Sequence, residues 1–163
     1  MTTTPAPVVT PHPWDDKLPS PPAPVASYVP VRSVAVAGQR WLTTSGMLPM
    51  VQGQLAFTGK VGGNGLSVEQ ANQAARQCVL NALAALKAEL GSLAAITQVV
   101  KVTVFVASND GFDQQPQVAN GASHTLTDVL GDTIGRHARS AVGVAMLPLN
   151  APVEVEVTVV AAG

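Results

Sequence analysis

Apolar residues recur along this chain at two spacings, one typical of helices and one typical of strands. Over residues 67–90 they return every three or four positions, which predicts an α-helix with one face on a core. Ser67 and Gln70 form a capping-box pair at its start, and Gly91 is typical of a helix end. A second helix is predicted over residues 116–130, with Pro116 in its first turn.

Six shorter segments alternate apolar and polar residues or are continuously apolar, and they predict strands. They are residues 31–37, 41–45, 54–58, 99–107, 139–146 and 153–159. With the two helices they give the order strand–strand–strand–helix–strand–helix–strand–strand. Helices segregated from a mixed sheet are typical of the α+β class. We therefore expect a two-layer domain in which two helices cover one face of a six-stranded mixed sheet. We expect other subunits to cover the other face of the sheet.

The last two predicted strands carry the candidate chemistry. Because strand side chains alternate between faces, Arg139, Ala141 and Gly143 share one face of the first of them. An arginine keeps its charge in a dry site, so a recess that contains it and is lined by small side chains suits a small carboxylate. On the next strand Glu154 and Glu156 face away from a row of valines. We expect Arg139 and Glu154 to share the uncovered face of the sheet. The alternative is that Arg139 pairs with one of these glutamates, or that all three lie on a solvated face.

Composition and charge narrow the functional classes. The chain has 163 residues, 47% hydrophobic and 12% charged, which indicates one globular domain that hides part of its surface by self-association. A formal net charge of −1 without a lysine and arginine cluster argues against a nucleic-acid partner. The three histidines have no metal-ligand spacing, so we expect no metal. No secretion signal or membrane-spanning run is found, so we expect a cytoplasmic protein without a membrane partner.

The N-terminal segment differs in composition from the rest of the chain. Residues 1–27 contain eight of the 13 prolines and no periodic apolar pattern. Such a segment is typical of an extended or disordered arm. The sequence thus predicts a proline-rich arm over residues 1–27 and a single domain over residues 28–163.

Several motifs together resemble the Rid family (YjgF-type, reactive imine deaminases), whose fold is similar to that of trimeric chorismate mutases. The most specific are Ala138-Arg139-Ser140 and Val153-Glu154-Val155-Glu156, at the separation that the family shows. The others are Tyr28 before the first strand, Ser45-Gly46-Met47-Leu48-Pro49, the long helix and residues 100–106. Residues 112–123 and 135–144 are similar to a less studied branch often labelled endoribonuclease L-PSP. The resemblance covers about residues 25–161.

The resemblance implies a homotrimer with three clefts between its subunits. In the better-known members an arginine in the cleft binds the carboxylate of a 2-imino acid, and a glutamate holds or activates water. By motif these catalytic positions are Arg139 and Glu154, and no cofactor is implied. The substrate-binding positions that the resemblance implies are Arg139, Ser45, Gly46, Asn120, Ala141 and Tyr28.

Two positions depart from the family's pattern. Ala141 stands where the family usually has a cysteine, and Gly143 stands where it has an acidic residue. We expect these changes to enlarge or empty the cleft beside Arg139, which would alter the carboxylate that it accepts.

Three functions follow as hypotheses. The first is hydrolytic deamination of reactive 2-imino or enamine acids to 2-oxo acids and ammonia, with Arg139 anchoring the carboxylate and Glu154 holding water. The second is a non-catalytic trimer that binds a small carboxylate or regulates a partner enzyme, which the missing side chains at Ala141 and Gly143 favour. The third is an endoribonuclease, for which the sequence offers no basic groove and only His137 near the site.

Overall fold

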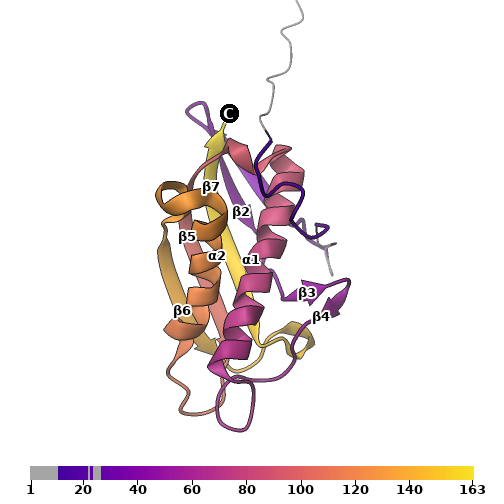
Figure 1. The fold of residues 1–163 in the computed structure, drawn as a ribbon, viewed down its shortest axis with the longest axis vertical. Helices are drawn as coiled ribbons and strands as arrows, with labels where there is room; N and C mark the ends of the chain where they lie inside the picture. The colour runs from indigo at the N-terminus through magenta and orange to yellow at the C-terminus, as the bar shows by residue number, and fades with distance from the viewer. Residues whose placement is uncertain (1–10, 22, 24–26) are drawn as a thin grey trace, which may run out of the picture.

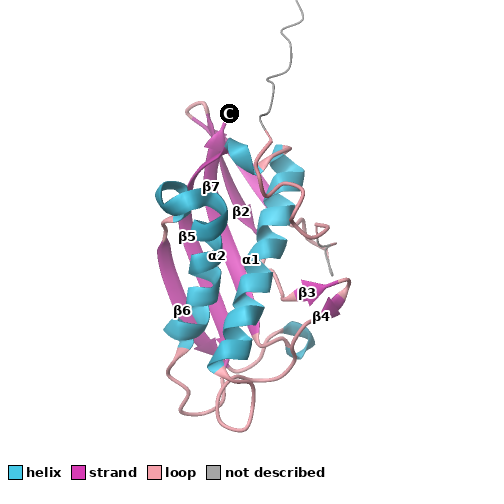
Figure 2. Ribbon diagram, viewed as in Figure 1, coloured by secondary structure: helices cyan, strands magenta, loops and turns pink. Residues whose placement is uncertain are grey.

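The computed structural model describes residues 11–21, 23 and 27–163, and most of them form a five-stranded sheet with two helices on one face (Figures 1 and 2). The strands of this sheet are β1 (Val31–Val36), β2 (Gln39–Thr44), β5 (Ile96–Ala107), β6 (Ala138–Val144) and β7 (Val153–Ala162). The helices are α1 (Val68–Leu90) and α2 (Gln115–Gly135), with short 3-10 turns at Leu93–Ala95 and Pro148–Asn150. The order across the sheet is β1-β2-β7-β5-β6, in which β5 and β6 are parallel and the other neighbours antiparallel. The α+β class and the mixed sheet under two helices are confirmed.

The hydrophobic core lies between the sheet and the two helices. Its sheet side consists mainly of fully buried valines on two central strands, namely Val153, Val155, Val157 and Val159 of β7 with Val102, Val104 and Val106 of β5. Gly121 lets α2 lie close against α1, because a β-carbon there would overlap the backbone oxygen of Asn72. The Asn72 side chain also donates a hydrogen bond of 3.0 Å to the backbone oxygen of Gln117. Among the described residues no helix covers the other face of the sheet, which we call the open face (Figure 1). Its residues include Trp41, Phe105, Val142, Glu154 and Glu156.

Both helices begin close to their predicted starts. The Ser67 hydroxyl accepts from the Gln70 N–H at 3.1 Å, and the Gln70 side chain accepts from the Ser67 N–H at 3.0 Å. Gly91 ends α1 with a φ of 85°, a value that glycine adopts without strain. Helix α2 continues beyond the predicted residue 130, across a break at Gly131, and leads into β6. Within the described ranges no helix is long and apolar enough to cross a membrane.

The third predicted strand does not join the main sheet, so that sheet has five strands rather than six. Residues 54–58 were expected as a strand, but only β4 (Gln54–Leu55) forms, paired with β3 (Met50–Val51). The turn between them has positive φ at Gln52 and Gly53, the backbone conformation of a tight hairpin. Two amides of α1 hold this hairpin against the helix, because Gln77 and Asn81 both donate to the backbone oxygen of Met50.

Part of the N-terminal arm folds onto the domain. Asp15 is 7% exposed and accepts hydrogen bonds from the Ser92 hydroxyl at 2.6 Å and the Leu93 N–H at 3.0 Å. Burial alone would raise the pKa of Asp15, but these hydrogen bonds, another from His12 and the charge of Lys87 lower it overall. The extended or disordered state predicted for residues 1–27 therefore does not hold around Asp15. Residues 1–10, 22 and 24–26 lie outside the described part of the chain, and the division at residue 28 stays a prediction.

Candidate functional site

Strand β6 and helix α2 together position Arg139. In the parallel pairing of β5 with β6, Arg139 stands beside Val102, so its side chain lies on the helix-covered face of the sheet. Its Nη1 donates to Asn120 Oδ1 at 2.9 Å and to Ser123 Oγ at 3.1 Å, and its Nη2 donates to the backbone oxygen of Pro116 at 3.3 Å. All three acceptors belong to α2 and are uncharged. We call Arg139 with these three acceptors the arginine site.

The charge of Arg139 is not neutralised within the described part of the chain. No carboxylate among those residues lies within 4.0 Å of its guanidinium, and the one ion pair found there joins Arg40 to Glu89. This excludes, within one protomer, the alternative in which Arg139 pairs with Glu154 or Glu156. A guanidinium that is oriented by neutral acceptors and half-buried favours an anionic ligand, and its planar donors match a carboxylate.

His137 contacts the arginine site through Ser123. Its Nε2 lies 2.9 Å from Ser123 Oγ, and its Nδ1 lies 2.6 Å from the backbone oxygen of Gly135. The sequence placed His137 near Arg139 but did not single out Ser123. The signal was present, because Ser123 follows Asn120 by three residues and so lies on the same side of α2.

The two small residues Ala141 and Gly143 have neighbours on the helix-covered face of the sheet. Ala141 packs against the hydrophobic core. Above Gly143 lies the Gln115 amide, whose Nε2 would be 2.9 Å from a β-carbon at that position. Gln115 is held there by hydrogen bonds to the Phe112 backbone oxygen at 2.8 Å and to Ser108 Oγ at 3.3 Å. Gly143 nevertheless stays exposed, and the expected enlargement of a cleft beside Arg139 stays a prediction.

Glu154 lies on the open face of the sheet. It pairs with Phe105 of β5, whereas the buried Val155 pairs with the buried Val104 on the helix-covered face. Burial raises the pKa of Glu154, and the negative charge of Glu156 raises it further. Within the described residues its carboxylate accepts no hydrogen bond. A carboxylate with a raised pKa is a stronger base, which suits it to accept a proton from water.

The segment after β2 packs against Glu154. Met47 forms a bridge with Val155, through backbone hydrogen bonds of 2.8 and 3.0 Å. This brings Gly46 so close to Glu154 that a β-carbon at Gly46 would overlap the carboxylate. We call Glu154 and Gly46 the glutamate site. The neighbouring Ser45 hydroxyl donates to the backbone oxygen of Val29 at 2.7 Å.

The structure thus divides the predicted site residues into two groups. Asn120 and Ala141 accompany Arg139, whereas Gly46 and Ser45 accompany Glu154. Tyr28 precedes the Val29 carbonyl that Ser45 binds, and its side chain is 42% exposed. The expectation that Arg139 and Glu154 share one face is wrong. The physical reason is the β5–β6 register, since a shift by one residue would turn Arg139 to the open face.

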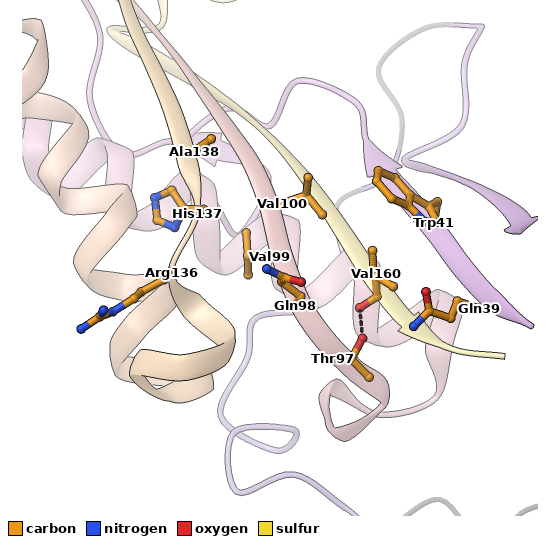
Figure 3. Close-up of a pocket in the computed structure, with 10 residues that line it drawn as sticks. All are labelled: Gln39, Trp41, Thr97, Gln98, Val99, Val100, Arg136, His137, Ala138 and Val160. Atoms are coloured by element: carbon orange, nitrogen blue, oxygen red, sulfur yellow. Dashed lines mark hydrogen bonds between the residues drawn. The ribbon is translucent and has the colours of Figure 1, made fainter. Parts of the chain in front are cut away.

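A hollow of about 520 Å³ lies at the end of the sheet where the pairing of β5 with β6 begins, next to the pair of Lys101 and Ala138. The residues around it are Gln39, Trp41, Thr97, Gln98, Val99, Val100, Arg136, His137, Ala138 and Val160. Figure 3 shows the Arg136 side chain and the His137 ring directed away from Trp41. None of the seven predicted site residues lines this hollow. Within the described residues no cluster of three or more histidine, cysteine or acidic side chains could hold a metal ion.

Comparisons with known proteins agree with the motifs. The profile of the family described as Endoribonuclease L-PSP matches residues 19–161. Protein TCP17 of Trypanosoma cruzi is 43% identical over 143 residues, which cover 88% of this chain and 86% of that protein. The crystal structure of Atu1372, a protein of unknown function from Agrobacterium tumefaciens, is 44% identical with a TM-score of 0.74 and 82% of each chain covered. The YjgF gene product of E. coli is 26% identical with a TM-score of 0.58, covering 88% of this chain and 93% of that one.

Proposed function

The chain belongs to the Endoribonuclease L-PSP family, which includes YjgF and the Rid proteins, and on this premise we propose that it hydrolyses reactive 2-imino acids to 2-oxo acids and ammonia. The observation that carries the proposal is the arginine site. Arg139 has five N–H donors, and those that α2 does not engage can bind a substrate carboxylate in a planar, two-point contact. Such a contact fixes the position of the reacting imine carbon.

Glu154 supplies the base in this proposal. Water held by its carboxylate attacks the imine carbon, a C–O bond forms, and Glu154 takes the proton. The same proton then passes to nitrogen as the C=N double bond becomes single, which gives an amino alcohol. Its hydroxyl proton moves to nitrogen by way of Glu154, the C–N bond breaks as the C=O bond forms, and the products are ammonia and a 2-oxo acid. The raised pKa of Glu154 supports this role, because a carboxylate with a higher pKa takes a proton from water more readily.

The two faces of the sheet place a condition on this chemistry. A small substrate that touches both Arg139 and Glu154 has to lie between two copies of the chain, since the two side chains lie on opposite faces of one protomer. A homotrimer whose subunits cover one another's open faces meets this condition. Exposed apolar side chains on that face support self-association, and they include Val34 (53% exposed), Trp41 (40%) and Val142 (43%).

A second candidate is a trimer that binds a small carboxylate without catalysis. It is favoured by one observation, that the arginine site is complete within a single protomer whereas the glutamate site lies elsewhere. The endoribonuclease activity in the family's description has less support, because nine lysines and arginines against ten acidic residues give no excess of positive charge.

The test is the decay of 2-iminopropanoate, followed with wild type and with Arg139→Gln. Glutamine keeps amide donors toward α2 but removes the positive charge. The proposal expects faster decay with wild type and background decay with the variant, both assembled alike. Carboxylate binding without faster decay would favour the second candidate, and equal activity of both proteins would contradict the role of Arg139.

A further inference from the structure

A chain of hydrogen bonds runs from the end of α2 to the guanidinium of Arg139. The Gly135 backbone oxygen lies 2.6 Å from His137 Nδ1, and His137 Nε2 lies 2.9 Å from Ser123 Oγ. Ser123 Oγ in turn accepts from Arg139 Nη1 at 3.1 Å. No hydrogen bond between described residues joins His137 directly to Arg139, whereas Ser123 is bonded to both.

The chemistry of the groups fixes the direction of each hydrogen bond. A backbone oxygen can only accept, so the Nδ1 of neutral His137 carries the proton. Its Nε2 then has a lone pair, and the Ser123 hydroxyl must donate to it. The single proton of Ser123 is thereby used on His137, and its oxygen presents lone pairs to Arg139 Nη1.

We propose that His137 is a positioning residue for Arg139. By holding the Ser123 hydroxyl in one rotamer, it gives Nη1 two fixed acceptors, Ser123 and Asn120. The remaining donors of the guanidinium are then free to bind a substrate carboxylate. That the ligand is a carboxylate rests on the proposed function. A long side chain oriented before binding loses less conformational freedom when the ligand arrives, so affinity rises.

A purely structural role for His137 is the competing explanation. Its Nδ1–H contact with the Gly135 oxygen ties the end of α2 to the start of β6, and this alone would justify a histidine there. Two substitutions separate the roles. In His137→Asn the side-chain amide remains near the Nδ1 position, so the Gly135 contact is kept and the Ser123 contact is lost. In His137→Gln the amide oxygen reaches the Nε2 position, so the Ser123 contact is kept.

The first experiment is calorimetric titration of the full chain with pyruvate, a stable 2-oxo acid. We expect His137→Asn and Ser123→Ala to weaken binding about three- to ten-fold each, and the double variant to be no weaker than either, because both act through one contact. His137→Gln should bind like wild type. Full affinity in His137→Asn with loss in His137→Gln, or additive effects in the double variant, would overturn the proposal.

A second readout needs no ligand. In the free protein, NMR of the Arg139 guanidinium should show restricted rotation in wild type and His137→Gln and faster rotation in His137→Asn. If wild type fails to bind pyruvate yet shows this pattern, the proposed function fails while the positioning role stands. If the rotation rate is the same in all three proteins, the positioning role is wrong whatever the ligand.

Discussion

Arg139 and Glu154 lie on opposite faces of one β-sheet, with Arg139 beside Val102 under α2 and Glu154 beside Phe105 on the open face. Each side chain has its own support, since α2 acceptors hold the arginine and Gly46 makes room for the carboxylate. A single protomer therefore presents two separate half-sites. Chemistry that needs both must bring together two copies of the chain.

Replacing Glu154 with glutamine should abolish imine hydrolysis and leave pyruvate binding intact. General-base catalysis contributes about 10²- to 10⁴-fold to a rate, so decay should fall by at least about 10²-fold. The assay is 2-iminopropanoate decay, with pyruvate titration as the control for the arginine site. Full activity in Glu154→Gln would remove Glu154 from the mechanism.

The same substitution should change how stability depends on pH. Burial and Glu156 raise the pKa of folded Glu154 above its unfolded value, so its favourable contribution is present below the unfolded pKa and is lost as pH rises through the folded pKa. Glu154→Gln should therefore be more stable than wild type at neutral pH, and the difference should shrink as pH falls through the folded pKa and vanish below the unfolded value, about pH 4. Urea unfolding of both proteins across this range measures it, and a constant difference at every pH would contradict the assignment.

Replacing Asp15 with asparagine should detach the arm and destabilise the fold. The asparagine has one acceptor oxygen fewer and no charge, so hydrogen bonds from Ser92 or Leu93 would be lost. The free energy of unfolding should fall by about 1–3 kcal/mol at pH 7. The pKa of Asp15 is lowered, so its contribution is present above the unfolded pKa and is lost as pH falls through the folded value. The neighbouring exposed Asp16→Asn is the matched control in urea unfolding. Equal stability of the two variants would show that the Asp15 contact adds nothing.

Placing a methyl group at Gly46 should displace Glu154. A β-carbon there overlaps the carboxylate, so Gly46→Ala should cost about 1–3 kcal/mol and reduce activity. In a Glu154→Ala background the same change should lower the free energy of unfolding much less, because the carboxylate that the β-carbon overlaps is absent. A double-mutant cycle by denaturant unfolding gives the coupling, and a cost independent of Glu154 would show that the overlap is not the cause.

Local features of the sequence predicted the local structure well. The apolar spacing and the Ser67 capping box gave α1 nearly to the residue, and alternation identified the strands of the main sheet. Strand β4 was predicted too long and β3 was not predicted, because two-residue strands carry too few positions to show a period. The Asp15 contact was missed because its partner Ser92 is 77 residues away and no local pattern reports it.

The candidate site was only half predictable for the same reason. Alternation within β6 correctly grouped Arg139 with Ala141 and Gly143, and alternation within β7 separated Glu154 from the valines. Which face of β6 meets the helices depends on its register against β5, a long-range pairing that the pattern within one strand does not specify. The close approach of Gln115 to Gly143 likewise depends on where α2 lies.

We propose that Arg139 of one subunit works with Glu154 of another. Arg139→Gln and Glu154→Gln, each inactive alone, are mixed in equal amounts, unfolded and refolded together, and assayed for 2-iminopropanoate decay. Random assembly joins an intact arginine to an intact glutamate at about one quarter of the interfaces, so we predict recovery of about a quarter of wild-type activity. A mixture as inactive as its two components, with mixed assembly verified, would contradict a site shared between subunits.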